Sequence, residues 1–124
     1  MLPKEDIEGV KVLMELLADR WTVPVLGTLC AGGGRKRFNA IRRELGAISP
    51  KSLAVCLQRL ELNGLVERHV ATVRPLAVEY RVTPLGHTLD QPVEALLEWS
   101  RVNAGAVGEA RNAFRVRAED AATD

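Results

Sequence analysis

Two helical patterns near the middle of the chain are separated by a turn of only about three or four residues. The first is a short apolar stripe over residues 38–45 that stops at Gly46, a residue type that commonly ends helices. The second begins where Ser49 suits the N-cap and Pro50 suits the first helical position, which needs no backbone N–H. This spacing predicts a helix-turn-helix.

The helix that begins after Ser49 repeats its apolar residues at helical spacing, which predicts one buried face. These residues are Leu53, Cys56, Leu57 and Leu60, and the pattern ends at Asn63 and Gly64. The period then shifts toward two, because residues 65–72 and 77–83 are rich in valine and flank a short turn at residues 73–76. A β-hairpin after a helix-turn-helix predicts a winged helix-turn-helix, a mainly α fold with a small β-hairpin wing.

Further helices are expected on both sides of this centre. An apolar stripe over residues 7–18 predicts a first helix, and a second stripe, which we expect Thr22 to cap, runs from Trp21 to the triple glycine at residues 32–34. Residues 35–38 are then predicted to form an extended segment or a short strand. After the hairpin, Thr83 and Pro84 repeat the cap-plus-proline pattern, and a last apolar stripe contains Val93, Leu96, Leu97, Trp99 and Val102. We expect one domain over residues 1–117, with helices at both ends for dimerisation, and a disordered tail over residues 118–124.

Composition argues against several classes of protein. The apolar runs are too short for a membrane span, and the first residues lack the pattern of a signal peptide, so we expect a cytoplasmic protein with no membrane partner. His69 and His87 stand far apart with no cysteine near either in the sequence, and the triple glycine lacks the Lys and Ser/Thr of a phosphate-binding loop. We therefore expect no enzyme, no metal site and no cofactor. Cys30 and Cys56 lie within apolar patterns and are interpreted as core residues.

Positive charge is concentrated in the middle of the chain. The net charge is only +1, yet residues 35–74 hold nine basic and three acidic residues, whereas the remainder holds eight basic and thirteen acidic ones. A basic block between acidic arms favours a surface that faces phosphates, although a solvated charged face would have the same composition.

The candidate DNA contacts follow from the predicted elements, since the second helix of such a motif enters the major groove. On that helix we expect Ser49, Lys51, Ser52, Val55, Gln58 and Arg59 to face DNA. We expect the DNA backbone to be contacted by Lys36, Arg37, Arg42 and Arg43. From the wing we expect contacts by Arg68, His69 and Arg74. Solvated surface residues remain the alternative for each of these, most strongly for His69.

Several runs resemble those of HxlR-type winged helix-turn-helix regulators, relatives of the MarR group. They are Asp19-Arg20-Trp21-Thr22-Val23-Pro24-Val25-Leu26, Arg37-Phe38-Asn39-Ala40-Ile41, Ile48-Ser49-Pro50-Lys51-Ser52-Leu53, the run from Leu57 to Arg68, and the run from Val78 to Gly86. The resemblance implies a homodimer built from the first and last helices, two recognition helices reading a roughly palindromic site in double-stranded DNA, and repression or activation of neighbouring genes; of the two, we expect repression.

One departure concerns the effector. Many members of that family carry a cysteine upstream of the tryptophan, and some use it to sense oxidants or electrophiles, but this chain reads Asp6-Ile7-Glu8-Gly9 there. Thiol sensing at that position is therefore excluded, and a small-molecule effector stays open. The alternative function is a winged-helix protein-interaction module that does not bind DNA.

Overall fold

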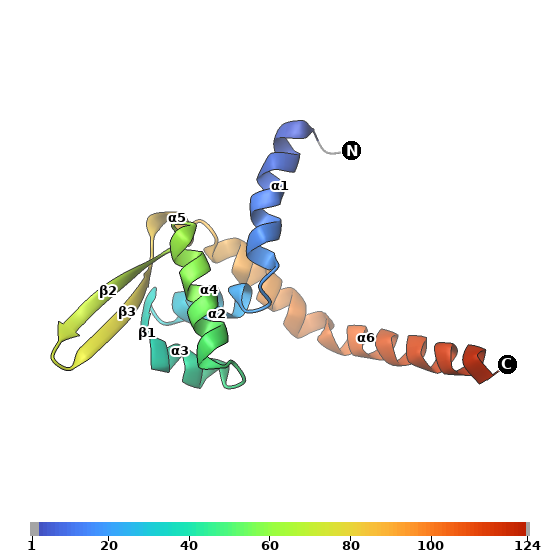
Figure 1. The fold of residues 1–124 in the computed structure, drawn as a ribbon. Helices are drawn as coiled ribbons and strands as arrows, with labels where there is room; N and C mark the ends of the chain where they lie inside the picture. The colour runs from blue at the N-terminus through green and yellow to red at the C-terminus, as the bar shows by residue number, and fades with distance from the viewer. Residues whose placement is uncertain (1–2, 124) are drawn as a thin grey trace. The chain divides into compact units, whose positions relative to one another are not determined.

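A computed structural model describes residues 3–123, which form five helices and a three-stranded sheet followed by one long helix (Figure 1). In chain order the elements are α1 (Lys4–Leu17), α2 (Thr22–Ala31), β1 (Arg35–Arg37), α3 (Phe38–Leu45), α4 (Pro50–Leu62), β2 (Val66–Val73), β3 (Leu76–Val82), α5 (Pro84–His87) and α6 (Asp90–Thr123). This order confirms the predicted winged helix-turn-helix.

The helix-turn-helix consists of α3 and α4, and its turn depends on two local features. Gly46 adopts a φ of 66° at the end of α3, a conformation that side chains with a Cβ rarely adopt. Ser49 then caps α4 by accepting a hydrogen bond from the backbone N–H of Ser52 at 3.0 Å, with Pro50 in the first turn. The cap predicted from the sequence is confirmed.

The wing is the hairpin of β2 and β3, and β1 pairs with its other side in the order β1-β3-β2 (Figure 1). All pairs are antiparallel, with Arg35 opposite Arg81 and Glu67 also opposite Arg81. Thr83 holds the base of the wing, since its hydroxyl donates to the carbonyl of Gly64 at 2.6 Å and accepts from the N–H of Gly86 at 3.0 Å. The wing is thereby fixed to the end of α4.

The core lies between α2, α3, α4 and the base of the sheet. Its fully buried side chains are Val25, Leu26, Leu29, Ile41, Leu53, Cys56, Leu57, Leu60 and Val66. These include every residue of the apolar stripe predicted on α4, so one face of that helix is fixed against the core and the opposite face is fixed toward solvent.

The flanking helices differ from the sequence expectation in several places. Thr22 does not cap α2; its side chain is buried and its hydroxyl donates to the carbonyl of Leu16 at 2.7 Å, because α2 begins at Thr22 itself. Pro92 lies in the first turn of α6, where proline is tolerated. Where the sequence suggests a disordered tail, α6 continues to Thr123 through alanine-rich residues that favour helix; residue 124 lies outside the described part.

The chain divides into two compact units, one that ends at Val93 and one that begins at Glu94 and contains the rest of α6. Within the described residues, no helix combines the length and apolar character that a membrane span requires.

Candidate nucleic-acid interface

The recognition helix α4 presents one exposed stripe opposite its buried face. Lys51, Val55 and Gln58 are all exposed and follow one another at spacings of four and three residues, which places them on one line along the helix. Val55 is 45% exposed, high for a branched apolar side chain in a small domain. This is the face that the sequence predicted, and it offers a cation, an amide and a methyl-bearing surface together.

Sequence reasoning missed two members of that stripe. Ala54 is exposed beside Val55, and Leu62 is 84% exposed four residues after Gln58. The same helical spacing would have found both, but a search for polar side chains passes over apolar ones.

Arg59 is placed differently from the exposed stripe. Its guanidinium Nη1 lies 3.4 Å from the carboxylate Oδ2 of Asp19, whose side chain is only 11% exposed. Asp19 also accepts a hydrogen bond from the backbone N–H of Trp21 at 2.8 Å, at the turn between α1 and α2. Arg59 therefore ties the recognition helix to that turn. Asp19 lies forty residues earlier in the chain, so no local pattern predicts this pair.

Some of the basic side chains around α3 are exposed to solvent, and another forms an ion pair within the fold. Arg37 and Arg43 are exposed, and they line a groove of about 490 Å³ between the start of α3 and the strand β3. Lys36, by contrast, is half-buried and forms an ion pair with Glu44. Glu44 also accepts a hydrogen bond from the hydroxyl of Thr28 at 2.8 Å, and these two partners, Lys36 foremost, lower the pKa of its carboxyl. Lys36 thus joins β1 to α2 and α3.

Arg42 lies between these two groups. Its side chain is half-buried, and its Nε is enclosed without a hydrogen-bond partner in the described part of the chain. An N–H enclosed in this way is not accessible to DNA, so Arg42 is not grouped with the exposed cations.

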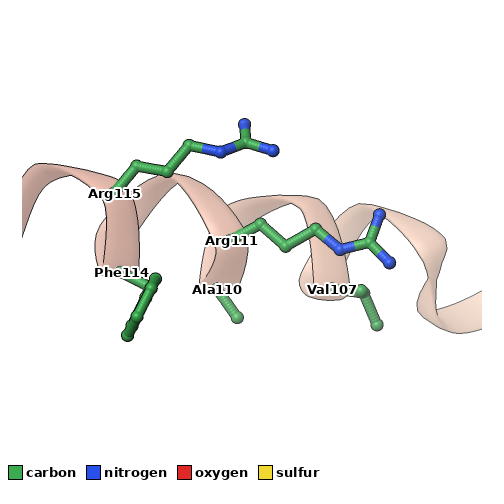
Figure 2. Close-up of a pocket in the computed structure, with 5 residues that line it drawn as sticks. All are labelled: Val107, Ala110, Arg111, Phe114 and Arg115. Atoms are coloured by element: carbon green, nitrogen blue, oxygen red, sulfur yellow. The ribbon is translucent and has the colours of Figure 1, made fainter. Parts of the chain in front are cut away.

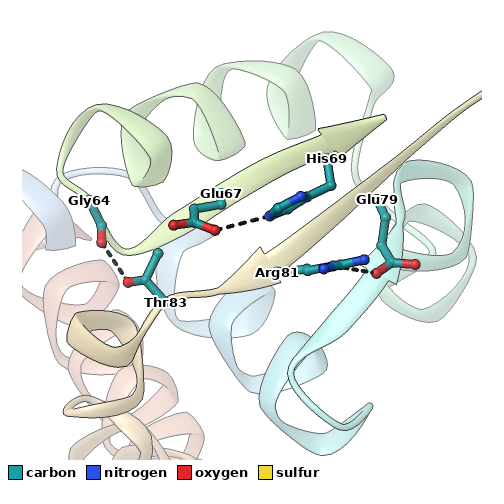
Figure 3. A network of polar contacts seen from close by, with 6 residues as sticks. All are labelled: Gly64, Glu67, His69, Glu79, Arg81 and Thr83. Carbon is teal, nitrogen blue, oxygen red and sulfur yellow. Dashed lines mark hydrogen bonds and ion pairs between the residues drawn. The ribbon is translucent and has the colours of Figure 1, made fainter. Parts of the chain in front are cut away.

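The wing carries the remaining candidates, and Figure 3 shows His69 with its charged neighbours. Arg68 and Arg74 are exposed, and Arg74 lies at the tip of the hairpin. His69 is half-buried, and its Nε2 lies 3.0 Å from the carboxylate of Glu67 on the same face of β2. Glu67 and His69 stand opposite Arg81 and Glu79 of β3, which form an ion pair of 2.8 Å themselves.

The alternation of charges makes this face of the wing nearly self-neutralising. The hydrogen bond from Arg81 is the main cause of the lowered pKa of Glu79. His69 consequently lies among acidic and basic partners, whereas Arg68 is on the opposite side of the strand and Arg74 lies beyond it.

A second polar cluster lies away from these surfaces, at the junction of α2, α5 and α6. The thiol of Cys30 donates to Oδ1 of Asp90 at 3.0 Å, and Nδ1 of His87 lies 2.9 Å from Oδ2 of the same carboxylate. Burial first and Asp90 second raise the pKa of the Cys30 thiol to about 12. Sequence spacing suggested no such grouping, because Cys30 and Asp90 are sixty residues apart.

The other cysteine is a core residue, as the sequence analysis expected. Cys56 is fully buried on the inner face of α4, and burial is the main cause that raises the pKa of its thiol to about 12.

Comparisons with known proteins agree with this architecture. The family model described as HxlR-like helix-turn-helix matches residues 16–107. The HTH-type transcriptional regulator YtfH of Escherichia coli (strain K12) is 38% identical over 91 residues, which cover 73% of this chain and 71% of YtfH.

Two solved structures have the same fold. The transcriptional regulator ytfH from Salmonella typhimurium aligns with a TM-score of 0.72 and 36% identity, covering 83% of this chain and 90% of that one. The redox regulator HypR in its reduced form aligns with a TM-score of 0.72 and 30% identity, covering 82% and 98%.

Proposed function

This chain belongs to the HxlR-like helix-turn-helix family of transcription regulators, and on that premise we propose that it is a cytoplasmic homodimeric repressor that reads a specific double-stranded DNA site. The observation that carries the proposal is the stripe of Lys51, Val55 and Gln58 on α4, which is exposed along a helix whose other face is fully buried. A side chain can distinguish one base from another only if its helix is held rigidly. This helix is held by its buried face, by the Ser49 cap and by the ion pair of Arg59 with Asp19.

Each exposed residue on α4 has chemistry suited to a position in the major groove. Gln58 can both donate to and accept from a base edge, Lys51 can donate to guanine or to phosphate, and Val55 can contact a thymine methyl group. Ser49 and Ser52 stand at the N-terminal end of α4, where free backbone N–H groups favour a phosphate. We assign Arg59 to positioning the helix rather than to reading a base.

The phosphate contacts that we propose surround this helix. Arg37 and Arg43 are exposed beside the groove at the start of α3, whereas the Nε of Arg42 is enclosed, so we assign Arg42 to supporting this surface from within. Arg68 and Arg74 extend the positive surface along the wing, with His69 as a minor contributor because Glu67 holds its ring. We propose that Lys36 does not contact phosphate but holds β1 against α3 through its ion pair with Glu44.

The proposed dimer rests on two apolar surfaces that the single chain leaves in solvent. On α1, Ile7, Leu13, Met14 and Leu17 are between 42% and 63% exposed. On α6, one stripe at steps of three or four residues, the spacing of one helix face, is apolar except for Asn103; it consists of Leu96, Trp99, Asn103, Val107, Ala110 and Phe114. Figure 2 shows Val107, Ala110 and Phe114 on one side of α6 and the arginines 111 and 115 on another. Such exposure of large apolar side chains favours burial against a second copy.

Neighbouring substitutions on α6 test the dimer. Phe114→Glu places a charge in the stripe and should shift the protein from dimer to monomer in sedimentation experiments. Arg115→Glu introduces the same residue on the other side of the helix and should leave the dimer intact. A dimer that survives Phe114→Glu and the corresponding Trp99→Glu would exclude α6 from the interface.

DNA binding is tested by selection from random duplexes, followed by titration of the selected site against a scrambled one at several salt concentrations. We expect two half-sites about one helical turn apart and an affinity that falls by on the order of 10³- to 10⁵-fold between about 50 and 200 mM salt. A protein-interaction module would select no sequence. Transcription from a promoter that carries the selected site should fall when the protein is present, and a rise would make it an activator.

HypR is described as a redox regulator, but the two cysteines of this chain are poorly placed for redox control. Cys56 is buried in the core, and the Cys30 thiol donates a hydrogen bond to the carboxylate of Asp90. Since the reactive form of a cysteine is the thiolate, and the pKa of both thiols is raised to about 12, we propose that control comes from something other than thiol oxidation.

A further inference from the structure

We propose that Cys30, His87 and Asp90 form a binding site for a borderline divalent transition-metal ion, with Zn²⁺ the best match. The thiol sulfur, an imidazole nitrogen and a carboxylate oxygen of these three residues all lie within 4.8 Å of one another. The site is independent of the DNA-binding surface, so the proposal does not depend on the proposed function.

Three separate elements deliver the ligands to one point. Cys30 is in the last turn of α2, His87 ends α5, and Asp90 is the first residue of α6. The Asp90 carboxylate stands between the other two, with Oδ1 at 3.0 Å from the Cys30 sulfur and Oδ2 at 2.9 Å from Nδ1 of His87. The carboxylate therefore already holds the two other donors in place.

The backbone around the imidazole is shaped to admit it. A Cβ built on Gly34 would lie 3.2 Å from Cε1 of His87, closer than side chains normally pack. Gly34 has a φ of 83° and its carbonyl accepts from the N–H of Val82 at 2.8 Å, so its position beside the ring is fixed by the sheet. A glycine there leaves room for the His87 ring against the backbone.

The donor set selects the class of ion. One sulfur, one nitrogen and one carboxylate oxygen suit Zn²⁺, whereas Mg²⁺ and Ca²⁺ prefer oxygen ligands alone. Ligands of one tetrahedral Zn²⁺ lie roughly 3.4 to 3.6 Å apart. Side-chain rotation therefore needs to shorten the widest separation, which is within 4.8 Å, by only about 1 Å and to lengthen the 3.0 Å contact between Cys30 and Asp90 by about 0.5 Å. Three protein ligands leave the fourth position to water or another small ligand.

Binding replaces hydrogen bonds that the cluster makes without metal. The ion takes the place of the Cys30 S–H proton, which is released to solvent, and the thiolate sulfur and the Asp90 carboxylate both bond to the cation. His87 and Asp90 side chains are 47% and 43% exposed, so the ion has a path from solvent. Once bound, it would link the end of α2 to α5 and the first turn of α6.

The test titrates the full-length, untagged and reduced protein with Co²⁺ and then Zn²⁺ in the absence of DNA. We expect one Co²⁺ per chain, a near-ultraviolet thiolate-to-cobalt charge-transfer band, and loss of that band when Zn²⁺ displaces Co²⁺. Saturating Zn²⁺ should also raise the Tm by about 5 °C or more, because it binds the folded chain.

Variants identify the ligands. Cys30→Ser should abolish the band, and His87→Gln and Asp90→Asn should each weaken Zn²⁺ binding about 100-fold or more in competition with a chromophoric chelator. His69→Gln is the matched control, since His69 also pairs with a carboxylate but has no cysteine beside it, and it should bind Zn²⁺ like the original protein. Circular dichroism confirms folding, and His87→Gln decides the outcome if Cys30→Ser is unfolded. No cobalt band, or equal Zn²⁺ affinity in the original protein and His87→Gln, would overturn the site.

Discussion

The ion pair between Arg59 and Asp19 makes it possible to test the positioning role that we propose for Arg59 against the base-reading role that we propose for Gln58. Its atoms are 3.4 Å apart, with side chains 38% and 11% exposed. At this distance the Coulomb attraction is about 5 kcal/mol for an effective dielectric constant of about 20. Solvent screening of the exposed guanidinium and the entropy of holding it reduce the net value, so we expect a coupling of about 1 kcal/mol.

A double-mutant cycle measures that coupling. Arg59→Ala, Asp19→Asn and the double variant are unfolded in urea, and the interaction energy is the non-additive part of the changes in free energy of unfolding. Asp19→Asn keeps a side-chain oxygen for the N–H of Trp21, so it removes the charge without removing the hydrogen bond at the start of α2.

The same variants are then assayed on selected and scrambled DNA, with Gln58→Ala for comparison. We expect Gln58→Ala to lower the preference for the selected site by about 1–3 kcal/mol, because a base-edge contact is lost. Arg59→Ala should reduce stability and leave that preference within about threefold, a change of less than about 1 kcal/mol. If Arg59→Ala removed the preference as Gln58→Ala does, with unchanged stability, Arg59 would leave Asp19 on DNA and read a base, as the sequence alone suggested.

Three further results follow from contacts described above. Gly86→Ala should destabilise the fold by about 2–3 kcal/mol in urea unfolding, because the new Cβ would lie 2.1 Å from the carbonyl oxygen of Leu65. Gly105→Ala, whose Cβ would meet no atom within 4 Å, should instead stabilise α6 by about 0.5–1 kcal/mol. Equal effects of the two substitutions on the free energy of unfolding would contradict this packing. Arg74→Ala should weaken selected and random DNA alike and reduce the magnitude of the salt slope by about 2, because a dimer loses two cations. A loss confined to the selected site would mean that the wing reads sequence. Glu44→Gln should lower the Tm at pH 7, and the difference should shrink as the pH falls from about 4.3, the unfolded value, through the lower pKa of the folded protein, because the stabilisation is lost as the group protonates. A difference that does not shrink on acidification would refute the role of its charge.

The fold was predictable because its determinants are local. The Ser49-Pro50 start of α4, its stripe of buried leucines and the shift to a two-residue period at the wing are all patterns of neighbours in the chain. The exposed face of α4 followed from the same periodicity, so Lys51, Val55 and Gln58 were found correctly as exposed residues.

The partners of individual side chains were not predictable, since they come from distant segments. Lys36 and Arg59 are basic residues in a basic block, and nothing local shows that Glu44 and Asp19 engage them. The cluster of Cys30, His87 and Asp90 was missed for the same reason, because three elements meet there only after the fold has formed.

These pairings change how the positive charge of the chain should be counted. Of the basic candidates, Arg37, Arg43, Lys51, Arg68 and Arg74 are exposed, whereas Lys36, Arg42 and Arg59 are half-buried, two of them in ion pairs. A cation that is already paired releases no counterion when DNA binds, so the exposed group alone should set the salt dependence. Two protomers with five exposed cations each predict a slope of log K against log salt of up to about −9, while the full set of eight per protomer would give about −14. A measured slope near the steeper value would show that DNA draws Lys36 and Arg59 away from Glu44 and Asp19, and that the positioning role assigned to both residues holds only in the free protein.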